Sequence, residues 1–400
     1  MNEFIRIGDI CDILNGYAFK SSKYVADGIR VIRITNVQKG FVEDTNPQYY
    51  PVSEQREIEK YMLCEGDLLM SLTGNVGRVG LLSAEMLPAA LNQRVACIRI
   101  RNPAVIYKPF LFHLLNSDYF ENKCILASQG VAQKNMSTEW LKEYPIPSFS
   151  MDKQMEIASI FDKIDDLIAR RKEQVRNMDQ AVKSRFIELF GDPVSNSMGL
   201  PTEPMTTVCA IIDGDRGKNY PKQDEFSDTG YCLFLNAKNV TATGFSFENR
   251  MFITKEKDDA LHNGKLERGD VVLTTRGTLG NLAFYDDSVP FENVRINSGM
   301  VILRMKKSVM TEVFFMEQFK LQLQSIKGKI ASGSAQPQLP ISTMNKIRIL
   351  LAPMALQEQF AAFVEQTDKS KYYSSLSFRY CQAAANTYRQ EWMTCRTSDF

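Results

Sequence analysis

The chain carries the same sequence pattern twice, about half a chain apart. Residues 65–77 resemble residues 268–280, because both read Gly-Asp, then apolar residues, then Gly-x-x-Gly, at an offset of 203 residues. The residue pairs at 36–37 and 132–133 recur at the same offset. Several matches in one order are not explained by chance similarity of glycine-rich turns. Because solenoid repeats have periods of about 20–50 residues, this long period indicates a duplicated domain.

Each repeat shows short apolar runs bounded by turn residues, a pattern typical of strands, with helical patterns between them. The clearest strands predicted in the first repeat are residues 29–34, 67–72 and 96–100. Helices are predicted over residues 110–120 and, in the second repeat, 312–326. We therefore predict two mixed α/β domains of the α+β kind, over residues 1–150 and 193–353.

The composition is that of an ordinary folded protein. Of 400 residues, 44% are apolar and 24% are charged, which excludes a chain disordered throughout and a collagen-like or disulfide-scaffold class. The net charge of +1 gives no global signature of a nucleic-acid binder, so such a function must rest on local patches. The sequence shows no transmembrane stretch and no signal peptide, and its scattered cysteines suit a reducing compartment. A cytoplasmic location is expected.

A long helix is predicted between the repeats, over residues 151–192. Residues 151–190 contain neither glycine nor proline, and both appear at once in the Gly-Asp-Pro at 191–193, a helix stop. Apolar residues follow a heptad seam from Ile157 to Leu189. At 1.5 Å per residue the helix is about 60 Å long. Such a helix either lies on its own domain or pairs with a partner helix, and its length favours a coiled coil.

The second repeat is followed by a helix that begins in the same way, over residues 354–400, but is atypical from about residue 372. The stretch 372–400 has no lysine, and 372–378 is poor in helix-forming residues. Either a frameshift or an exchanged end accounts for this tail. Alternatively, the tail is helical after all, with residues 382–392 supporting a few turns.

The sequence shows none of the usual catalytic constellations. The two histidines, His113 and His262, lie in different repeats, and the cysteines form no Cys-x-x-Cys pair, so neither a triad nor a zinc site is predicted. The Gly-x-x-Gly turns at 74–77 and 277–280 do not continue as phosphate-binding loops, and a tight turn is the simpler interpretation. The Asn-Pro-Gln-Tyr at 46–49 departs from the Asn-Pro-Pro-Tyr motif of amino-methyltransferases and is interpreted as a turn.

Polar and basic loops remain as candidates for binding. Residues 304–348 contain eight basic residues, opposed only by two glutamates at 312 and 317. Such a patch can neutralise DNA phosphates. Within it, loop 332–338 is rich in glutamine, and loop 128–135 stands at the matching place in the first repeat. Each loop by itself is a plausible solvated connector, but their parallel placement favours a shared role, since amide side chains can bond base edges.

The order of these motifs, present twice, resembles the DNA specificity subunit of type I restriction–modification systems. The resemblance covers about residues 1–371. It rests on the two Gly-Asp and Gly-x-x-Gly segments and on the short motifs Ile-Gly-Asp-Ile at 7–10, Asn-Gly-Tyr-Ala-Phe at 15–19, Gln-Met-Glu-Ile-Ala at 154–158, Gln-Glu-Gln-Phe-Ala at 357–361 and Phe-Gly-Asp-Pro at 190–193.

The resemblance implies two target recognition domains, each reading one half of a split site in double-stranded DNA. It implies two long antiparallel helices that dock two methyltransferase subunits, and a restriction subunit that joins them. The chain itself would have no active site and no cofactor, because S-adenosylmethionine binds the methyltransferase. Family members have a second long helix where this chain has its atypical tail, so a defective or shuffled copy is an alternative. A coiled-coil adaptor, or a stand-alone methyltransferase or nuclease, are the competing classes.

DNA contact is predicted for the turns after the Gly-Asp strands and for the glutamine-rich loops with their basic neighbours. The candidate residues are Thr73, Asn75, Arg78, Gln133, Lys134 and Asn135 in the first repeat, and Thr275, Arg276, Thr278, Asn281, Lys327, Lys329, Gln336 and Gln338 in the second. No catalytic or metal-binding residue is predicted.

Overall fold

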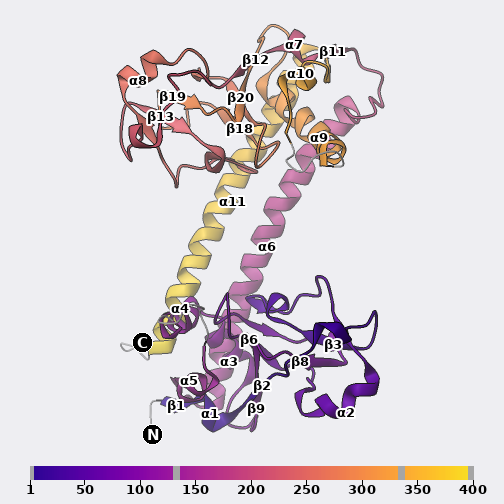
Figure 1. The fold of residues 1–400 in the computed structure, drawn as a ribbon, viewed down its shortest axis with the longest axis vertical. Helices are drawn as coiled ribbons and strands as arrows, with labels where there is room; N and C mark the ends of the chain where they lie inside the picture. The colour runs from indigo at the N-terminus through magenta and orange to yellow at the C-terminus, as the bar shows by residue number, and fades with distance from the viewer. Residues whose placement is uncertain (1–3, 129–135, 332–337, 395–400) are drawn as a thin grey trace. The chain divides into compact units, whose positions relative to one another are not determined.

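The computed structural model describes residues 4–128, 136–331 and 338–394, with only the backbone of 329–331 and 393–394. The chain forms two compact units, drawn together in Figure 1. Unit 1 comprises residues 1–173 and 374–400, and unit 2 comprises 174–373. Each unit therefore contains one repeat and part of each long helix, whereas the predicted domain bounds follow the ends of those helices. No helix among the described residues is long and apolar enough to cross a membrane.

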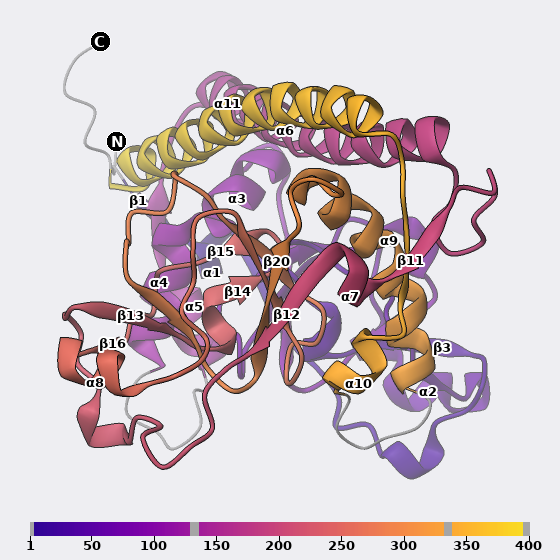
Figure 2. The same ribbon diagram turned by 90° about the horizontal axis from the view of Figure 1, so that it is seen from above.

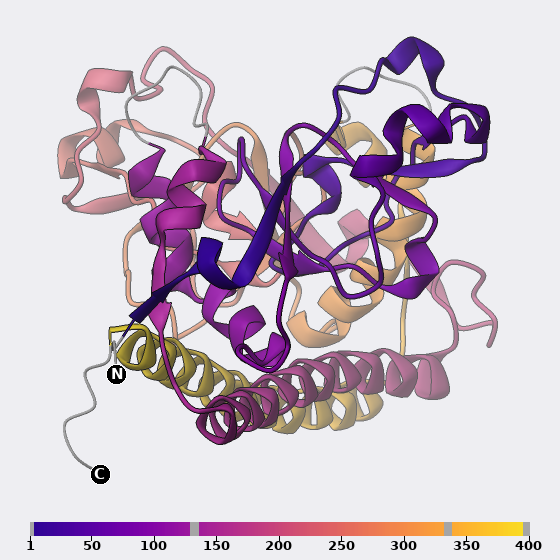
Figure 3. The same cartoon turned by 90° about the horizontal axis from the view of Figure 1, so that it is seen from below.

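Unit 1 is seen from its own end in Figure 3, where the first repeat is indigo and violet. Its strands are β1 (Phe4–Arg6), β2 (Cys11–Asn15), β3 (Ile29–Ile32), β4 (Gly40–Phe41), β5 (Tyr49–Tyr50), β6 (Leu68–Ser71), β7 (Val79–Leu81), β8 (Ala89–Leu91), β9 (Val95–Ile100) and β10 (Pro145–Pro147). Its helices are α1 (Ile7–Ile10), α2 (Gln55–Ile58), α3 (Lys108–Leu115), α4 (Asp118–Ala127) and α5 (Thr138–Glu143). The sheets have the orders β2-β9-β6-β7-β4, β5-β3-β8 and β1-β10.

Unit 2 is seen from its own end in Figure 2. Its strands are β11 (Thr202–Pro204), β12 (Cys209–Asp213), β13 (Cys232–Leu235), β14 (Val240–Thr241), β15 (Gly244–Phe245), β16 (Phe252–Ile253), β17 (Asp270–Thr274), β18 (Leu282–Tyr285), β19 (Val294–Ile296), β20 (Met300–Met305) and β21 (Arg348–Leu350). Its helices are α7 (Met205–Val208), α8 (Lys255–Ala260), α9 (Glu312–Ala331) and α10 (Ile341–Met344). The sheets have the orders β12-β20-β17-β18, β16-β13-β19, β14-β15 and β11-β21.

The two repeats have the same sheet plan, as the sequence offset predicts. The order β2-β9-β6-β7 in unit 1 corresponds to β12-β20-β17-β18 in unit 2. In each three-stranded sheet the central strand, β3 or β13, pairs antiparallel with one neighbour and parallel with the other. The repeats differ at β4, which joins the large sheet of unit 1, whereas β14 and β15 form a separate ribbon in unit 2. The prediction of a duplicated α+β domain is confirmed.

Most predicted elements are present, with one correction. The apolar runs at 29–34 and 67–72 contain β3 and β6, the run at 96–100 lies within β9, and β6 is buried along its whole length. The single helix predicted over 110–120 is wrong, because α3 ends at Leu115 and α4 begins at Asp118. The break is made by Ser117, whose hydroxyl accepts the N–H of Phe120 at 3.1 Å and so caps α4.

A buried glutamine joins each repeat to the start of its long helix. In unit 1, Gln154 is 2% exposed near the start of α6 (Met151–Phe190). Its side chain accepts the N–H of Tyr107 at 2.8 Å and donates to the carbonyls of Val105 at 3.0 Å and Phe149 at 2.9 Å. One amide thus satisfies three backbone groups where the chain enters α3 and α6, and so fixes the helix against the domain.

Unit 2 repeats this arrangement near the start of α11 (Met354–Thr394), where Gln357 is fully buried. Its amide makes the equivalent three bonds, to the N–H of Thr311 at 2.9 Å and the carbonyls of Val309 at 3.1 Å and Ala352 at 2.8 Å. The duplication therefore extends from the sheet order to single hydrogen bonds.

The long helices pair with each other inside each unit, as Figure 1 shows. In unit 1, Asp165 of α6 contacts Arg389 of α11, and Phe161 contacts Tyr388. In unit 2, Phe186 of α6 packs on Phe360 of α11 with ring centroids 5.5 Å apart. Within unit 1 the partners run in opposite directions from Asp165–Arg389 to Lys172–Phe378, and within unit 2 from Asp179–Lys371 to Phe186–Phe360. The helices are therefore antiparallel, and the prediction of a coiled-coil partner for α6 is confirmed.

The tail is helical, so the second alternative for residues 372–394 is correct. Helix α11 continues without a break to Thr394. Within unit 1 it buries Ser374, Ala385 and Trp392, and the Trp392 ring lies 5.5 Å from that of Phe149. Tertiary packing outweighs the weak intrinsic helix propensity of this stretch, as it does in most protein helices.

Replacing Gln357 with leucine is expected to destabilise unit 2 by about 2 kcal/mol or more, because orphaned buried backbone groups cost about 1–3 kcal/mol each. The measurement is urea unfolding of the chain. The matched control is Gln359→Leu, because Gln359 lies on the same helix and is exposed. Equal losses in both variants would mean that the buried amide has no special role.

Replacing Trp392 with alanine is expected to cost about 3–5 kcal/mol in the stability of unit 1, as for other large buried aromatic side chains. Tyr380→Ala is the control, since Tyr380 is an exposed aromatic residue on the same helix. Thermal melting followed by circular dichroism reports both. A Trp392→Ala variant as stable as the control would contradict the docking of the tail helix.

Candidate nucleic-acid interface

The turn after β17 in unit 2 is held by its own hydrogen bonds. The Thr274 hydroxyl donates to the carbonyl of Thr278 and accepts the N–H of Asn281 at 2.9 Å. Gly280 has φ +80°, and a side chain there would collide with Lys327. The Gly-x-x-Gly segment is therefore a fixed turn after a strand, as the sequence indicates.

Residues 338–339, which the chain reaches after α9, pair with this turn, and we call them the returning segment of unit 2. The N–H of Leu339 donates to the carbonyl of Thr275 at 3.0 Å, and Arg276 and Gln338 form an antiparallel bridge. A pocket of about 290 Å³ lies here, lined by Asp213, Arg216, Thr275, Arg276, Val301, Gln338, Leu339, Pro340, Ile341 and Ser342. The structure thus brings together three predicted residues, Thr275, Arg276 and Gln338, that are up to 63 positions apart in the sequence.

The predicted residues of this turn divide into two kinds. Arg276, Thr278 and Gln338 are exposed. Thr275 is 5% exposed, and its hydroxyl donates to the carbonyl of Gly299 at 3.0 Å. The Asn281 amide donates to the carbonyl of Val240 at 2.9 Å and so holds the β14–β15 ribbon. The first three side chains are available to a ligand, whereas Thr275 and Asn281 have hydrogen-bonding roles inside the domain.

The remaining predicted residues of unit 2 lie on α9 or beyond it. The half-buried Lys327 places its side-chain stem against Gly280 of the turn. The backbone of Lys329 belongs to α9, but its side chain and the whole of Gln336 lie outside the described residues. Lys327 therefore joins the turn to α9 and carries its charge beside the same surface.

The first repeat has the same turn at the end of β6. The Ser71 hydroxyl donates to the carbonyl of Asn75 and accepts the N–H of Arg78 at 3.2 Å, which matches the Thr274 pattern at an offset of 203. The N–H of Met136 donates to the carbonyl of Leu72 at 2.9 Å, as Leu339 does to Thr275 in unit 2. The returning segment therefore meets the turn in both repeats.

The predicted side chains of the first repeat are only partly described. Asn75 is exposed and Thr73 is half-buried. The Arg78 guanidinium donates to the Gln38 amide oxygen at 2.8 Å, so Arg78 holds a neighbouring loop much as Asn281 does in unit 2. Gln133, Lys134 and Asn135 lie outside the described residues.

The basic patch predicted over residues 304–348 is weaker than its composition suggests. Arg304 bonds Asp270 at 2.9 Å and Glu267 at 2.6 Å, so the expectation that only two glutamates oppose the patch is wrong. The reason is that β17 pairs with β20 in the sheet, so Asp270 at the start of β17 and Glu267 just before it lie beside Arg304 of β20. Arg348 is also engaged, with Thr202 at 3.0 Å. Among the lysines of this group whose side chains the structure describes, Lys327 lies against the turn.

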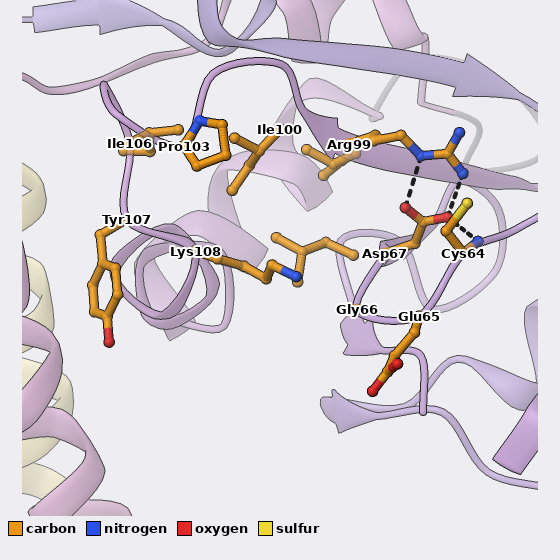
Figure 4. A pocket seen from close by; sticks show the side chains of 12 residues that line it. Cys64, Glu65, Gly66, Asp67, Arg99, Ile100, Pro103, Ile106, Tyr107 and Lys108 are labelled. Carbon is orange, nitrogen blue, oxygen red and sulfur yellow. Dashed lines mark hydrogen bonds and ion pairs between the residues drawn. The ribbon is translucent and has the colours of Figure 1, made fainter. Parts of the chain in front are cut away.

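A second pocket, of about 410 Å³, lies at the other end of β6 from the turn (Figure 4). At one side of the pocket the buried Asp67 pairs with Arg99, whose Nε is 2.9 Å from the carboxylate. The hydrogen bond to Asp67 raises the pKa of Arg99. Because Asp270 and Arg304 form the same pair in unit 2, we attribute this pair to domain structure and not to DNA reading.

The buried titratable groups in the described part of the chain have structural surroundings. Among the described residues no cluster of His, Cys, Asp and Glu is placed to hold a metal ion. His113 is buried with Nε2 2.8 Å from Asp162, and burial lowers its pKa, which fits a structural histidine. Burial raises the pKa of the Cys11, Cys209 and Cys232 thiols to about 12, so these thiols are not activated nucleophiles.

Sequence reasoning missed Asp213 and Arg216, which line the 290 Å³ pocket. A usable signal existed, because Asp213 ends β12 and Arg216 follows three residues later, at the place where the Asn-Gly-Tyr at 15–17 ends β2 and continues beyond it in the first repeat. The pocket forms only where β12, the turn after β17 and the returning segment meet in space.

Comparison with known proteins gives matches across most of the chain. The family model described as the type I restriction modification DNA specificity domain matches residues 2–177 and again 206–372. The MjaVIII specificity subunit of Methanocaldococcus jannaschii is 27% identical over 185 residues, covering 45% of this chain and 43% of that relative. The EcoAI specificity subunit of Escherichia coli is 32% identical over 171 residues, covering 42% of this chain and 28% of that relative. This chain thus spans less than half the length of these two relatives.

Solved structures share the fold over nearly the full length. The S subunit of a type I restriction–modification system from M. genitalium superposes with a TM-score of 0.52 at 15% identity, covering 98% of this chain and 95% of that one. A structure described as the basis of complex assembly and conformational transition of the type I R-M system gives 0.53 at 15% identity, covering 98% and 97%. Since the family model matches each repeat in turn, the chain belongs to the family of type I restriction–modification DNA specificity domains, of which it carries two.

Proposed function

We propose that this chain is the specificity subunit of a type I restriction–modification complex and that each repeat reads one half of a bipartite site in double-stranded DNA. The observation that supports this most is the matching turn and returning segment in both repeats, held by equivalent hydrogen bonds. Two copies of one surface suit two half-sites, because each copy can contact its own sequence.

The chemistry of the exposed side chains suits base reading. The arginine fork of Arg276 can bond guanine, and an amide such as Gln338 can bond adenine at two atoms. Lys327 supplies a positive charge for phosphates, which contribute affinity without sequence information. The rigid turn costs little entropy on binding, because its backbone is already fixed by Thr274.

The long helices are proposed to dock two methyltransferase subunits, to which a restriction subunit adds. Within unit 1, Tyr380 of α11 is 70% exposed, and within unit 2, Tyr373 is 69% exposed. Exposed aromatic rings on a helix are typical anchors of protein interfaces. The chain is proposed to be non-catalytic, with S-adenosylmethionine bound by the methyltransferase and not by this subunit.

The competing proposal is a coiled-coil adaptor without DNA recognition. The test is to assemble the chain with methyltransferase subunits from its host and to map methylated sites in the DNA of that host. We expect one bipartite sequence to be methylated by the complex and none by the chain alone. Methylation without sequence preference, or no complex, would refute the specificity-subunit proposal and would also be the result for a defective copy.

Replacing Gln338 with alanine is expected to weaken recognition of one half-site only, by about 1–3 kcal/mol for a lost bidentate base contact. The measurement is binding of the assembled methyltransferase complex to duplexes altered in either half. Gln359→Ala serves as the control, because Gln359 lies on the exposed face of α11. Equal weakening on both half-sites and on unrelated DNA would show that Gln338 positions the protein and does not read bases.

Replacing Lys327 with alanine is expected to weaken binding to all sequences alike. The slope of log affinity against log salt should decrease by about 1, as for the loss of one phosphate contact. Titrations from low to moderate salt on specific and unrelated duplexes measure both effects. A change of sequence preference with an unchanged salt slope would instead assign a base contact to Lys327.

A further inference from the structure

A loop after β12 places one more arginine beside the turn at 274–281 and the returning segment of unit 2, which together we call the reading surface. Arg216 follows the end of β12 by three residues and lines the pocket that also contains Arg276 and Gln338. Figure 2 shows β12 beside β20, and β20 lies between β12 and β17 in their shared sheet. Arg216 is therefore part of this surface although the turn and the returning segment do not include it.

The backbone that carries Arg216 is fixed on both sides. Gly214 packs so closely that a side chain there would lie 2.3 Å from the carbonyl oxygen of Asn297. Asp215 is 7% exposed and accepts the N–H of Gly217 and the N–H of His262, each at 2.8 Å. These backbone donors lower the pKa of Asp215, so its carboxylate stays charged and keeps the loop closed.

The Arg216 side chain is held from one side only. Its Nη2 lies 3.0 Å from the Asp213 carboxylate and 3.3 Å from the carbonyl of Ser298. Among the described residues, no hydrogen bond is made by its Nη1 or Nε. The side chain is 48% exposed. The guanidinium is thus oriented by Asp213 while its other donors remain available to a ligand.

This arrangement is better suited to a base than to stability or to phosphate. An ion pair that is this exposed contributes about 0–1 kcal/mol, so stability does not explain it. A phosphate would meet the Asp213 carboxylate next to Arg216 and would be repelled by it. A guanine edge offers two acceptors, O6 and N7, and no charge. Arg216 can meet both if Nη2 gives up its long 3.3 Å bond to Ser298, because that hydrogen then forms a fork with Nη1 or Nε while Asp213 still holds Nη2.

We propose that Arg216 reads a guanine in the half-site of unit 2 and that Asp213 is its positioning residue. This inference rests on the proposed function and adds a specific base to it. The first repeat has no counterpart, because Gly16 packs on Asn92 as Gly214 packs on Asn297, and Tyr17 and Ala18 follow it. The guanine contact therefore belongs to one half-site.

The test uses the full chain assembled with its methyltransferase subunits and a duplex library in which each position of the mapped bipartite site is varied. Arg216→Ala should lower affinity for the intact site about 5- to 150-fold, the equivalent of about 1–3 kcal/mol. The loss should be confined to one G·C pair in one half-site. Arg216→Lys should not restore the preference, because lysine lacks the planar fork, and Asp213→Asn should weaken the same preference.

The control is Lys218→Ala, which removes an exposed positive charge two residues away. It should weaken all sequences slightly and equally. Arg216 variants that behave like this control, or that bind like the wild type, would overturn the inference. The first half-site provides a folding check within each complex, since its preference should be unchanged. If the wild-type complex itself shows no sequence preference, the proposed function fails instead.

Discussion

The structure depends on one buried amide in each repeat. Gln154 and Gln357 each satisfy three backbone groups at the place where a domain meets its long helix. A buried amide tolerates little displacement, because every lost bond leaves a backbone group without water or partner. Each domain is therefore fixed to its helix at a defined orientation, which is what a protein needs if its binding surfaces are to keep a constant relation to their scaffold.

The proposed reading surface of each repeat is likewise held by a few hydrogen bonds. A hydroxyl at 71 or 274 closes the turn, and the returning segment pairs with the residue that follows it. The polar groups needed for this scaffold are then not available to a ligand, as Thr275 and Asn281 illustrate. Exposed side chains differ between the repeats while the scaffold is kept, which suits the proposal that each repeat reads its own half-site.

The tail shows how packing can override composition. Residues 372–378 are poor helix formers, yet α11 continues through them. Within unit 1 Ser374 is buried, and Lys172 of α6 lies over the Phe378 ring. Farther along, Nη2 of Arg389 lies 2.7 Å from each carboxylate oxygen of Asp165. A sequence that looks foreign to its family in composition is thus compatible with the second long helix of that family.

The sequence by itself determined the duplication, the strands of the apolar runs and the long heptad helix, because periodicity and repeat offset are local or one-dimensional signals. It also located the turn and the glutamine at 338. Only the tertiary structure decided which polar side chains are exposed. Arg276 is exposed, whereas the Asn281 amide donates to the carbonyl of Val240, which lies 41 residues earlier in the sequence. The same holds for Arg216, which reaches the pocket only because β12, β17 and the returning segment converge, and for Arg304, whose neutralising carboxylates lie on a different strand region. Long-range pairing determines these features, and local patterns do not report the pairing itself.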